Sequence, residues 1–217
     1  MLKTRLIPVL LLKNGRLVRS ENFKIHQIIG NPLHEVERFN EWNVDELIYL
    51  DITQSGDYDQ LRDDQKVKSI KNPLDTLSLV SKTCFVPLTW GGRIRTLDEM
   101  RELFRRGADK VTINTVAFRN PALVHQASKL FGSQAIVASI DVCKQLNGQY
   151  EVYIEGGSIP TGVDPETWAC ELEKLGAGEI LMQSIDRDGT GDGYDLKLIE
   201  TVTRSTTIPV IACSGVG

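Results

Sequence analysis

The chain has 217 residues, of which 41% are hydrophobic and 25% charged, with a net charge of −4 at neutral pH. This composition excludes a disordered or fibrous chain, and the acidic balance argues against a nucleic-acid-binding or membrane-surface protein. The longest apolar run, residues 6–12, is too short to span a membrane, and the four cysteines form no C-x-x-C pair, so we expect a reduced, cytoplasmic protein with one domain over residues 1–217.

Seven short apolar runs predict strands. In chain order they cover residues 6–12, 47–50, 84–88, 110–113, 135–140, 179–182 and 208–212. Most of these runs are nearly continuous rather than alternating. That pattern is typical of parallel strands whose two faces are both buried.

Helical patterns lie between several of these strands. A capping side chain followed by proline at the first helical position opens three of them, at Asn31-Pro32, Asn120-Pro121 and Asp164-Pro165. The predicted helices cover residues 32–42, 96–106, 121–132 and 165–175. Residues 54–83 are the least regular part, and their polar first half, 54–72, is expected to be either a solvated loop or an ordered binding lid.

This alternation of strands and helices predicts βαβ units and a parallel sheet. Residues 43–53 and 176–186 share an acidic residue followed by an apolar strand, which suggests two related halves. We therefore expect a (β/α)8 TIM barrel of two half-barrels. Because such barrels typically need about 250 residues, we expect the barrel to be incomplete after its seventh strand, with an open sheet as the alternative.

The working face of such a barrel lies at the C-terminal ends of its strands. The candidate residues there are Asp51, Gly91, Gly92, Asn114, Thr115, Asp141, Asp188, Gly189 and Gly215. Glycine-rich turns let backbone N–H groups approach a phosphate, although each is also an ordinary turn. Asp141 is a candidate general acid or base, or else a structural hydrogen-bond acceptor. The three histidines fit no metal-ligand spacing, so we expect neither a metal nor another cofactor.

Three sequence blocks resemble the cyclase subunit of imidazole glycerol phosphate synthase. They are DKVTINTVAFRNP (109–121), FGSQAIVASID (131–141) and GAGEILMQSIDRDGTGDGYD (176–195), and the similarity extends over the whole chain. The resemblance implies a (β/α)8 barrel that binds a bisphosphorylated ribonucleotide and forms a heterodimer with a glutaminase. It also implies that ammonia from that partner enters at the N-terminal face of the barrel and crosses to the site.

The active face departs from the family pattern. The resemblance implies two catalytic aspartates; one is present as Asp141, but the other position is Leu11, and leucine cannot transfer a proton. Arg93 stands where the family has a glycine, and Glu155 where a serine lies near a phosphate. We therefore expect the cyclase reaction to be lost.

The opposite face keeps the family pattern. The resemblance implies an ammonia gate of two basic and two acidic side chains, and an adjacent interface aspartate. The matching residues are Arg5, Glu46, Lys110, Glu179 and Asp109. Such a ring can also simply close the bottom of a barrel with paired charges.

Three hypotheses follow. The first is a paralogue that binds a glutaminase and delivers ammonia to another acceptor, such as a sugar in surface polysaccharide synthesis. The second is a genuine histidine-pathway cyclase in which Asp51 or Glu155 replaces the missing acid. The third is a non-catalytic scaffold that activates a glutaminase. None of them involves nucleic acid or a membrane.

Overall fold

The computed structural model describes residues 4–54, 58 and 72–216. The chain divides into two compact units, which we describe separately. The first comprises Met1–Arg19, Gln27–Ile94 and Asp98–Val111, and the second Ser20–His26, Arg95–Leu97 and Thr112–Gly217. Three strands and one helix run across these divisions: β2 (Arg16–Glu21), β3 (Ile25–Gly30), β6 (Lys110–Ile113) and α3 (Leu97–Arg105).

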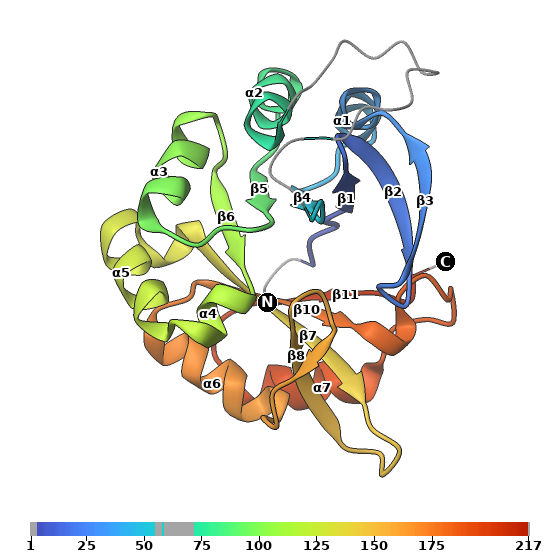
Figure 1. Ribbon diagram of the computed structural model, residues 1–217, viewed down its shortest axis with the longest axis vertical. Coiled ribbons are helices and arrows are strands. Elements are labelled where there is room, and N and C mark those ends of the chain that lie inside the picture. Colours follow the sequence, from blue (N-terminus) through green and yellow to red (C-terminus); the bar gives the residue numbers. More distant parts are fainter. Residues whose placement is uncertain (1–3, 55–57, 59–71, 217) are drawn as a thin grey trace. The chain divides into compact units, whose positions relative to one another are not determined.

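The first unit contains three parallel strands (Figure 1). β4 (Leu47–Asp51) lies between β1 (Val9–Lys13) and β5 (Leu88–Gly91), and β1 also pairs antiparallel with β2. The helices α1 (Pro32–Glu41) and α2 (Pro73–Thr83) pack against each other. The register pairs Tyr49 of β4 with Trp90 of β5, so both side chains lie on the same face of the sheet. Their rings stack with centroids 5.8 Å apart.

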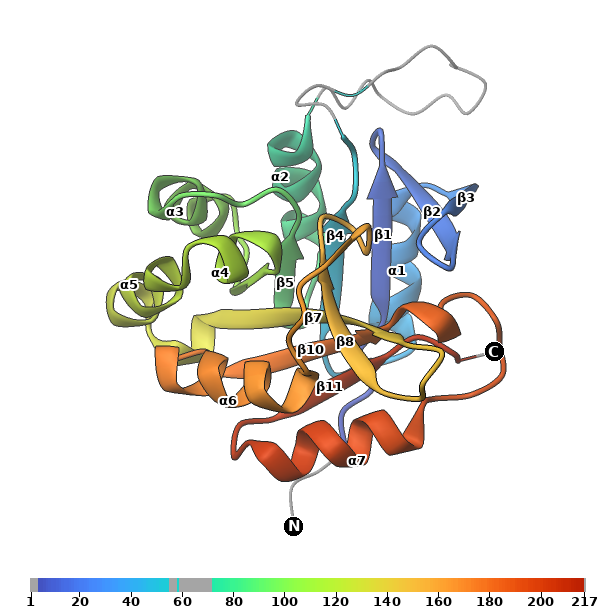
Figure 2. The ribbon, with the colours of Figure 1, turned by 60° about the horizontal axis from the view of Figure 1, so that its bottom comes forward.

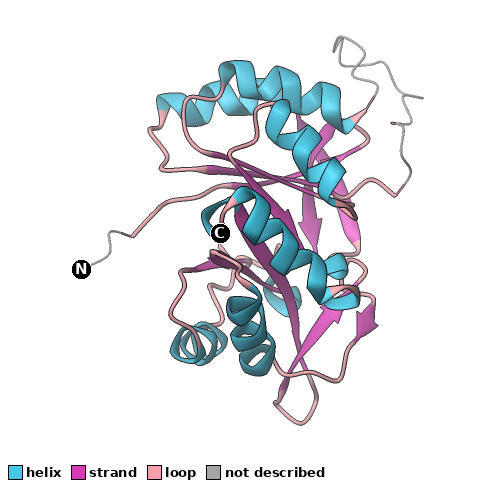
Figure 3. Ribbon diagram, turned by 90° about the vertical axis from the view of Figure 1, so that its left-hand side faces the viewer, coloured by secondary structure: helices cyan, strands magenta, loops and turns pink. Residues whose placement is uncertain are grey.

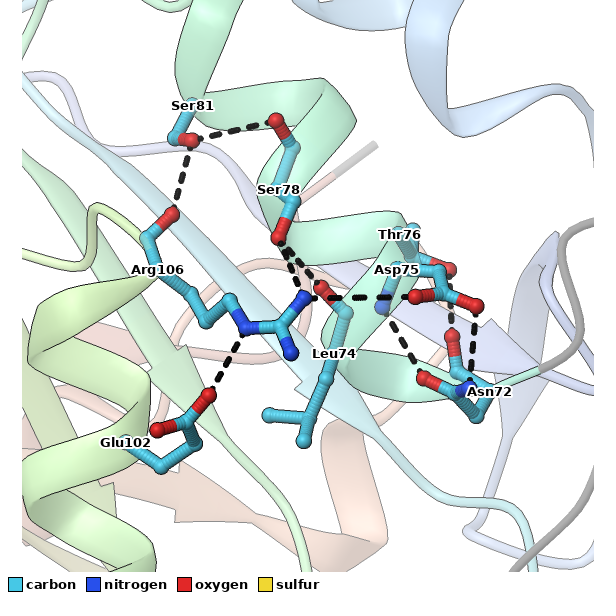
Figure 4. Close-up of polar contacts among 8 residues, drawn as sticks. All are labelled: Asn72, Leu74, Asp75, Thr76, Ser78, Ser81, Glu102 and Arg106. Atoms are coloured by element: carbon cyan, nitrogen blue, oxygen red, sulfur yellow. Dashed lines mark hydrogen bonds and ion pairs between the residues drawn. The ribbon is translucent and has the colours of Figure 1, made fainter.

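Arg106, which follows α3, ties α2 to α3 in this unit (Figure 4). Its guanidinium contacts Glu102 at 2.8 Å and Ser78 at 3.2 Å, and its backbone carbonyl accepts a hydrogen bond from Ser81. Asn72 caps α2 by accepting the backbone N–H of Asp75. These contacts fix both helices next to the strands that they connect.

The second unit also has a parallel core, formed by β7 (Ile136–Lys144), β10 (Glu179–Ser184) and β11 (Val210–Cys213), with β10 in the middle. β7 turns back into an antiparallel hairpin with β8 (Tyr150–Ile154), which pairs with β9 (Ile159–Pro160). Its helices are α4 (Thr115–Arg119), α5 (Pro121–Phe131), α6 (Pro165–Leu175) and α7 (Leu196–Ser205), and two short 3₁₀ turns cover Ser133–Ala135 and Ile185–Arg187. Figure 2 shows α6 and α7 beside these parallel strands.

The α/β class predicted from the sequence is confirmed, with parallel strands joined by helices as in part of a TIM barrel (Figure 3). The predicted strand at 84–88 is wrong except for Leu88, because residues 84–87 form the connection after α2 and the strand starts only after Pro87. Helices α2, α4 and α7 and the two hairpins were not predicted. The predicted loop or lid at 54–72 lies almost entirely outside the described residues. Among residues that the structure describes, no helix is long and apolar enough to cross a membrane.

Candidate functional site

Asp141 lies in the second unit, inside β7 rather than at its end as the sequence suggested. The strand continues to Lys144 because it extends into the β7–β8 hairpin. Asp141 is 4% exposed, and the side-chain amide of Gln183 donates to its Oδ1 at 3.1 Å. Burial raises the pKa of Asp141 to about 7, and Asp188 adds to the rise, whereas hydrogen bonds from Gln183 and Asn114 oppose it. A carboxyl group with such a pKa can exchange a proton near neutral pH.

Replacing this buried carboxyl should change how stability depends on pH. A folded-state pKa raised from 3.8 to about 7 means that wild-type stability is lost as pH rises through that interval. Asp141→Asn has no such titration. We therefore expect the free energy of unfolding of the variant, relative to that of the wild type, to increase between pH 4.5 and pH 8 by at most about 4 kcal/mol. Urea unfolding of both proteins at the two pH values measures this gain, and a pH-independent difference would contradict it.

Asn114 and Thr115 begin α4 in the same unit. Asn114 hydrogen-bonds to Asp141, and the Thr115 hydroxyl accepts the backbone N–H of Glu155 at 3.0 Å. The Glu155 carboxylate is 3.0 Å from the Arg119 guanidinium. The Glu155 carboxylate, at the position where the resemblance implies a serine near a phosphate, is therefore paired with a cation of the same unit.

Two glycine-rich loops follow β10 and β11 in this unit. Asp188 accepts from the Ser20 hydroxyl at 2.6 Å and from the backbone N–H of Phe23 at 3.1 Å. Gly189 and Gly215 have positive φ angles of 72° and 91°, and a Cβ on either would collide with a backbone carbonyl, that of Ser20 or Gly193 respectively. These glycines are thus required by close backbone approach, which is a structural reason independent of any ligand.

Asp51 organises the C-terminal ends of β4 and β5 in the first unit. It is 2% exposed and accepts from the backbone N–H of Thr53 at 2.9 Å and from the Tyr58 hydroxyl at 3.2 Å. The guanidinium of Arg93 lies 3.6 Å from its Oδ2. Burial raises the pKa of Asp51, and these hydrogen bonds and Arg93 counteract the rise. Arg93 thus replaces an expected glycine with an ion-pair partner for Asp51.

Gly92 follows Gly91, the last residue of β5, and is packed against Asp51. At its φ of +112° a Cβ would collide with the Asp51 carbonyl oxygen. We expect Gly92→Ala to lower the free energy of unfolding by about 3 kcal/mol or more, as overpacking and backbone strain add. Gly148→Ala is the control, because Gly148 also has positive φ but no atom lies within 4 Å of its Cβ position. Urea unfolding of both variants tests this, and equal losses would contradict a role for the close approach.

Leu11 and Asp51 face opposite sides of the sheet in the first unit. The register pairs Leu11 with Leu50, and Leu12 with Asp51, and successive residues of a strand alternate between faces. Asp51 therefore cannot take the place of an acid at Leu11. Of the two residues that the sequence suggested in place of the missing acid, Asp51 is thus excluded and Glu155 is left.

A charged network lies at the N-terminal ends of the strands in the first unit. Glu46, only 7% exposed, pairs with Arg5 through one oxygen and with Lys110 at 2.8 Å through the other. Asp109 accepts the backbone N–H of Leu88 at 2.8 Å, so it also aligns the start of β5. Glu179, at the start of β10 in the second unit, is 9% exposed.

Sequence reasoning missed two residues of these networks, Gln183 and Tyr58. Both contact a predicted aspartate: Gln183 is the neighbour of Asp141 in the strand register, and the Tyr58 hydroxyl donates to Asp51. A pocket of about 660 Å³ lies in the second unit, between the β7–β8 hairpin and the first turns of α6 and α7. None of the predicted site residues lines it. Among the described residues, no group of three or more His, Cys, Asp or Glu side chains is arranged to hold a metal ion.

Comparison with known proteins identifies a family and two relatives that this chain resembles. Residues 5–217 match the family described as "Histidine biosynthesis protein". The chain is 40% identical to the imidazole glycerol phosphate synthase subunit HisF of Alkaliphilus metalliredigens, and 42% identical to the protein of the same name from Bacillus cereus. Both similarities extend over all 217 residues and cover 82% of the relative.

Proposed function

This chain belongs to the histidine biosynthesis protein family, and we propose that it is a cyclase-like subunit that binds a glutaminase, receives its ammonia and delivers it to an acceptor other than the cyclase substrate. The observation that carries the proposal is a contrast within the first unit. The network of Arg5, Lys110 and the buried Glu46 has the residue types of the family's ammonia gate, whereas Leu11 replaces a proton-transferring aspartate. A chain under selection only for its own fold has no need of two cations around one buried carboxylate, because such pairs add little stability.

Exposed apolar side chains support a partner at the same end of the first unit. Leu6, Trp42 and Phe85 are 67%, 63% and 83% exposed, and each precedes one of the parallel strands β1, β4 and β5. Parallel strands begin at the same edge of a sheet, so these side chains and the Glu46 network share one end of the unit. Large apolar residues beside a polar rim are typical of protein interfaces.

Phe85 is the strongest candidate anchor for the glutaminase. Its backbone N–H donates to the Asn40 side-chain oxygen at 3.2 Å, and the Asn40 amide donates to the carbonyl of Thr83 at 2.6 Å. These bonds tie the connection before β5 to α1, so the ring is presented with little ordering cost on binding.

Replacing Phe85 should therefore weaken the complex. For Phe85→Asp we expect the affinity for the glutaminase subunit of an imidazole glycerol phosphate synthase to fall about 30-fold, as for a loss of ~2 kcal/mol at an interface anchor. Leu146→Asp is the control, because Leu146 is fully exposed at the tip of the β7–β8 hairpin in the second unit. Calorimetric titration measures both affinities, and an equal effect of the two variants would contradict the proposed docking surface.

The glutaminase reaction itself tests the whole proposal. The purified chain should bind the glutaminase and increase its rate of glutamine hydrolysis, while ammonium and the bisphosphorylated ribonucleotide give no imidazole glycerol phosphate. A chain that neither binds the glutaminase nor changes its rate would contradict the proposal. Stimulation alone is also expected of the non-catalytic scaffold, which would differ by transferring no ammonia to any acceptor.

For the acceptor, we propose a sugar of surface polysaccharide synthesis, on the basis of the family resemblance alone. For the site, the proposal retains Asp141 as the proton-transferring group, with Asn114, Thr115, Asp188, Gly189 and Gly215 in the second unit and Asp51, Gly91 and Gly92 in the first as residues that bind a phosphorylated ligand. For the fold, we propose a (β/α)8 barrel of two half-barrels that form one domain.

A second candidate function is the cyclase reaction itself. Identity of 40–42% over all 217 residues to synthase subunits favours it, as does the buried Asp141. Glu155 would then have to act in place of an acid at Leu11, although its carboxylate pairs with Arg119. Product formation by the wild-type chain from ammonium and the ribonucleotide would establish this function.

A further inference from the structure

Gln183 and Asp141 are direct neighbours across two parallel strands of the second unit. The register pairs Gln183 of β10 with Asp141 of β7. The Gln183 side-chain nitrogen lies 3.1 Å from Asp141 Oδ1 and 3.4 Å from the hydroxyl of Ser139. Gln183 is 8% exposed and Asp141 4%. The contact is therefore shielded from water, where a hydrogen bond to a charged group has its largest effect.

We propose that Gln183 is a positioning residue that holds the Asp141 carboxyl group in one orientation and favours its ionised form. An ionised carboxylate only accepts hydrogen bonds, and the amide NH₂ only donates. Gln183 turns its nitrogen toward Asp141, so this contact is satisfied by the carboxylate without a proton. A buried carboxylate without such a donor would protonate instead.

Of the other polar groups around Asp141, some favour its ionised form and others oppose it. Asn114 supplies a second amide hydrogen bond, while the charge of Asp188 opposes ionisation. The thiol of Cys213, at the end of β11, also interacts with Asp141, and burial raises the pKa of Cys213 to about 11. That thiol is therefore neutral near pH 7. Gln183 is the donor that the sheet register itself fixes, since its backbone lies next to that of Asp141.

This role does not depend on the proposed function. Ammonia transfer, cyclisation or binding alone would each encounter the same carboxyl group, and Gln183 would set its charge in every case. The test can therefore be made on the full chain without substrate or partner.

The experiment is a titration of the Asp141 carboxyl carbon by NMR. The full-length chain is labelled with ¹³C at the aspartate carboxyl, and the signal is assigned by its absence in Asp141→Asn. We expect the midpoint to rise by about one to two pH units in Gln183→Leu, as for loss of one hydrogen bond to a charged group. Ser139→Ala is the control, because it removes a contact of Gln183 but keeps the bond to Asp141, and its midpoint should stay within a few tenths of the wild type.

Gln183→Asn provides a second variant that keeps a polar amide in the sheet. Its shorter side chain withdraws the donor from Asp141, so the midpoint should again rise. It serves in place of Gln183→Leu if burial of a leucine beside Asp141 prevents folding, which circular dichroism reveals. A midpoint that is unchanged in the folded variants would overturn the proposal and leave Gln183 as a residue that only fills space.

Discussion

Under the proposed function, Leu11→Asp is expected to give the chain a cyclase activity that the wild type would lack. With saturating ammonium and the bisphosphorylated ribonucleotide, but no glutaminase, the variant should form imidazole glycerol phosphate about 10²–10⁴ times faster than the wild type, the usual contribution of one general acid or base. Leu11 lies in β1 at a half-buried position, so a carboxyl group there can be accommodated with access to solvent. Asp51 cannot supply the missing group, because it faces the other side of the sheet.

Leu11→Asn is the matched control for this experiment. The amide has nearly the shape of the carboxyl group but transfers no proton, so this variant should stay at the wild-type rate. Clear turnover by the wild type would contradict the proposed loss of cyclase activity. If neither the wild type nor Leu11→Asp formed product, Leu11 would not be the decisive change, and loss of substrate binding through Arg93 or Glu155 would be the better explanation.

Capping residues precede most helices, but two of them, Asn72 before α2 and Asp195 before α7, are not used in the sequence prediction. Asn31-Pro32 opens α1 and Asn72-Pro73 opens α2, each with the asparagine side chain as the cap, whereas Asn120-Pro121 opens α5 without a side-chain capping hydrogen bond. The polar run before Asn72 made this region look irregular, although the helix that follows has an ordinary proline at its first position. Strand β5 was misplaced because the apolar residues before Pro87 have strand propensity, whereas Phe85 is in fact exposed.

Candidate site residues could be proposed from the sequence, but their contacts could not be predicted. Asp51 and Asp141 stand out in the sequence because each follows a run of apolar residues. Their partners Tyr58 and Gln183 do not, because a tyrosine in a polar segment and a glutamine in a strand have many ordinary roles. Only the register shows that Gln183 lies beside Asp141, and that Leu11 and Asp51 face opposite sides.

Lys110→Met is expected to separate glutamine hydrolysis from ammonia delivery. Lys110 is one of the two cations on the buried Glu46 carboxylate, at 2.8 Å, and its loss leaves Arg5 as the cation paired with that group. The paired charges fix where the side chains lie, so under the proposed function their rearrangement should disturb the passage of ammonia at this end of the unit. With Leu11→Asp as the reporter of delivered ammonia, we expect the ratio of glutamine-driven to ammonium-driven product to fall about tenfold or more, equivalent to ~1.4 kcal/mol.

The same complex, in the Leu11→Asp background and with the ribonucleotide present, offers a second readout. Ammonia that escapes into solution can be measured with a coupled dehydrogenase while glutamate formation gives the rate of hydrolysis, and the escaping fraction should rise in Lys110→Met because less ammonia is consumed in the product. Lys82→Met is the control, because Lys82 is an exposed lysine in the last turn of α2 in the same unit and should change neither quantity. If Lys110→Met kept the wild-type ratio and the wild-type escape, the Glu46 network would be only a structural closure of this end of the unit, and the part of the proposed function that routes ammonia through it would be wrong.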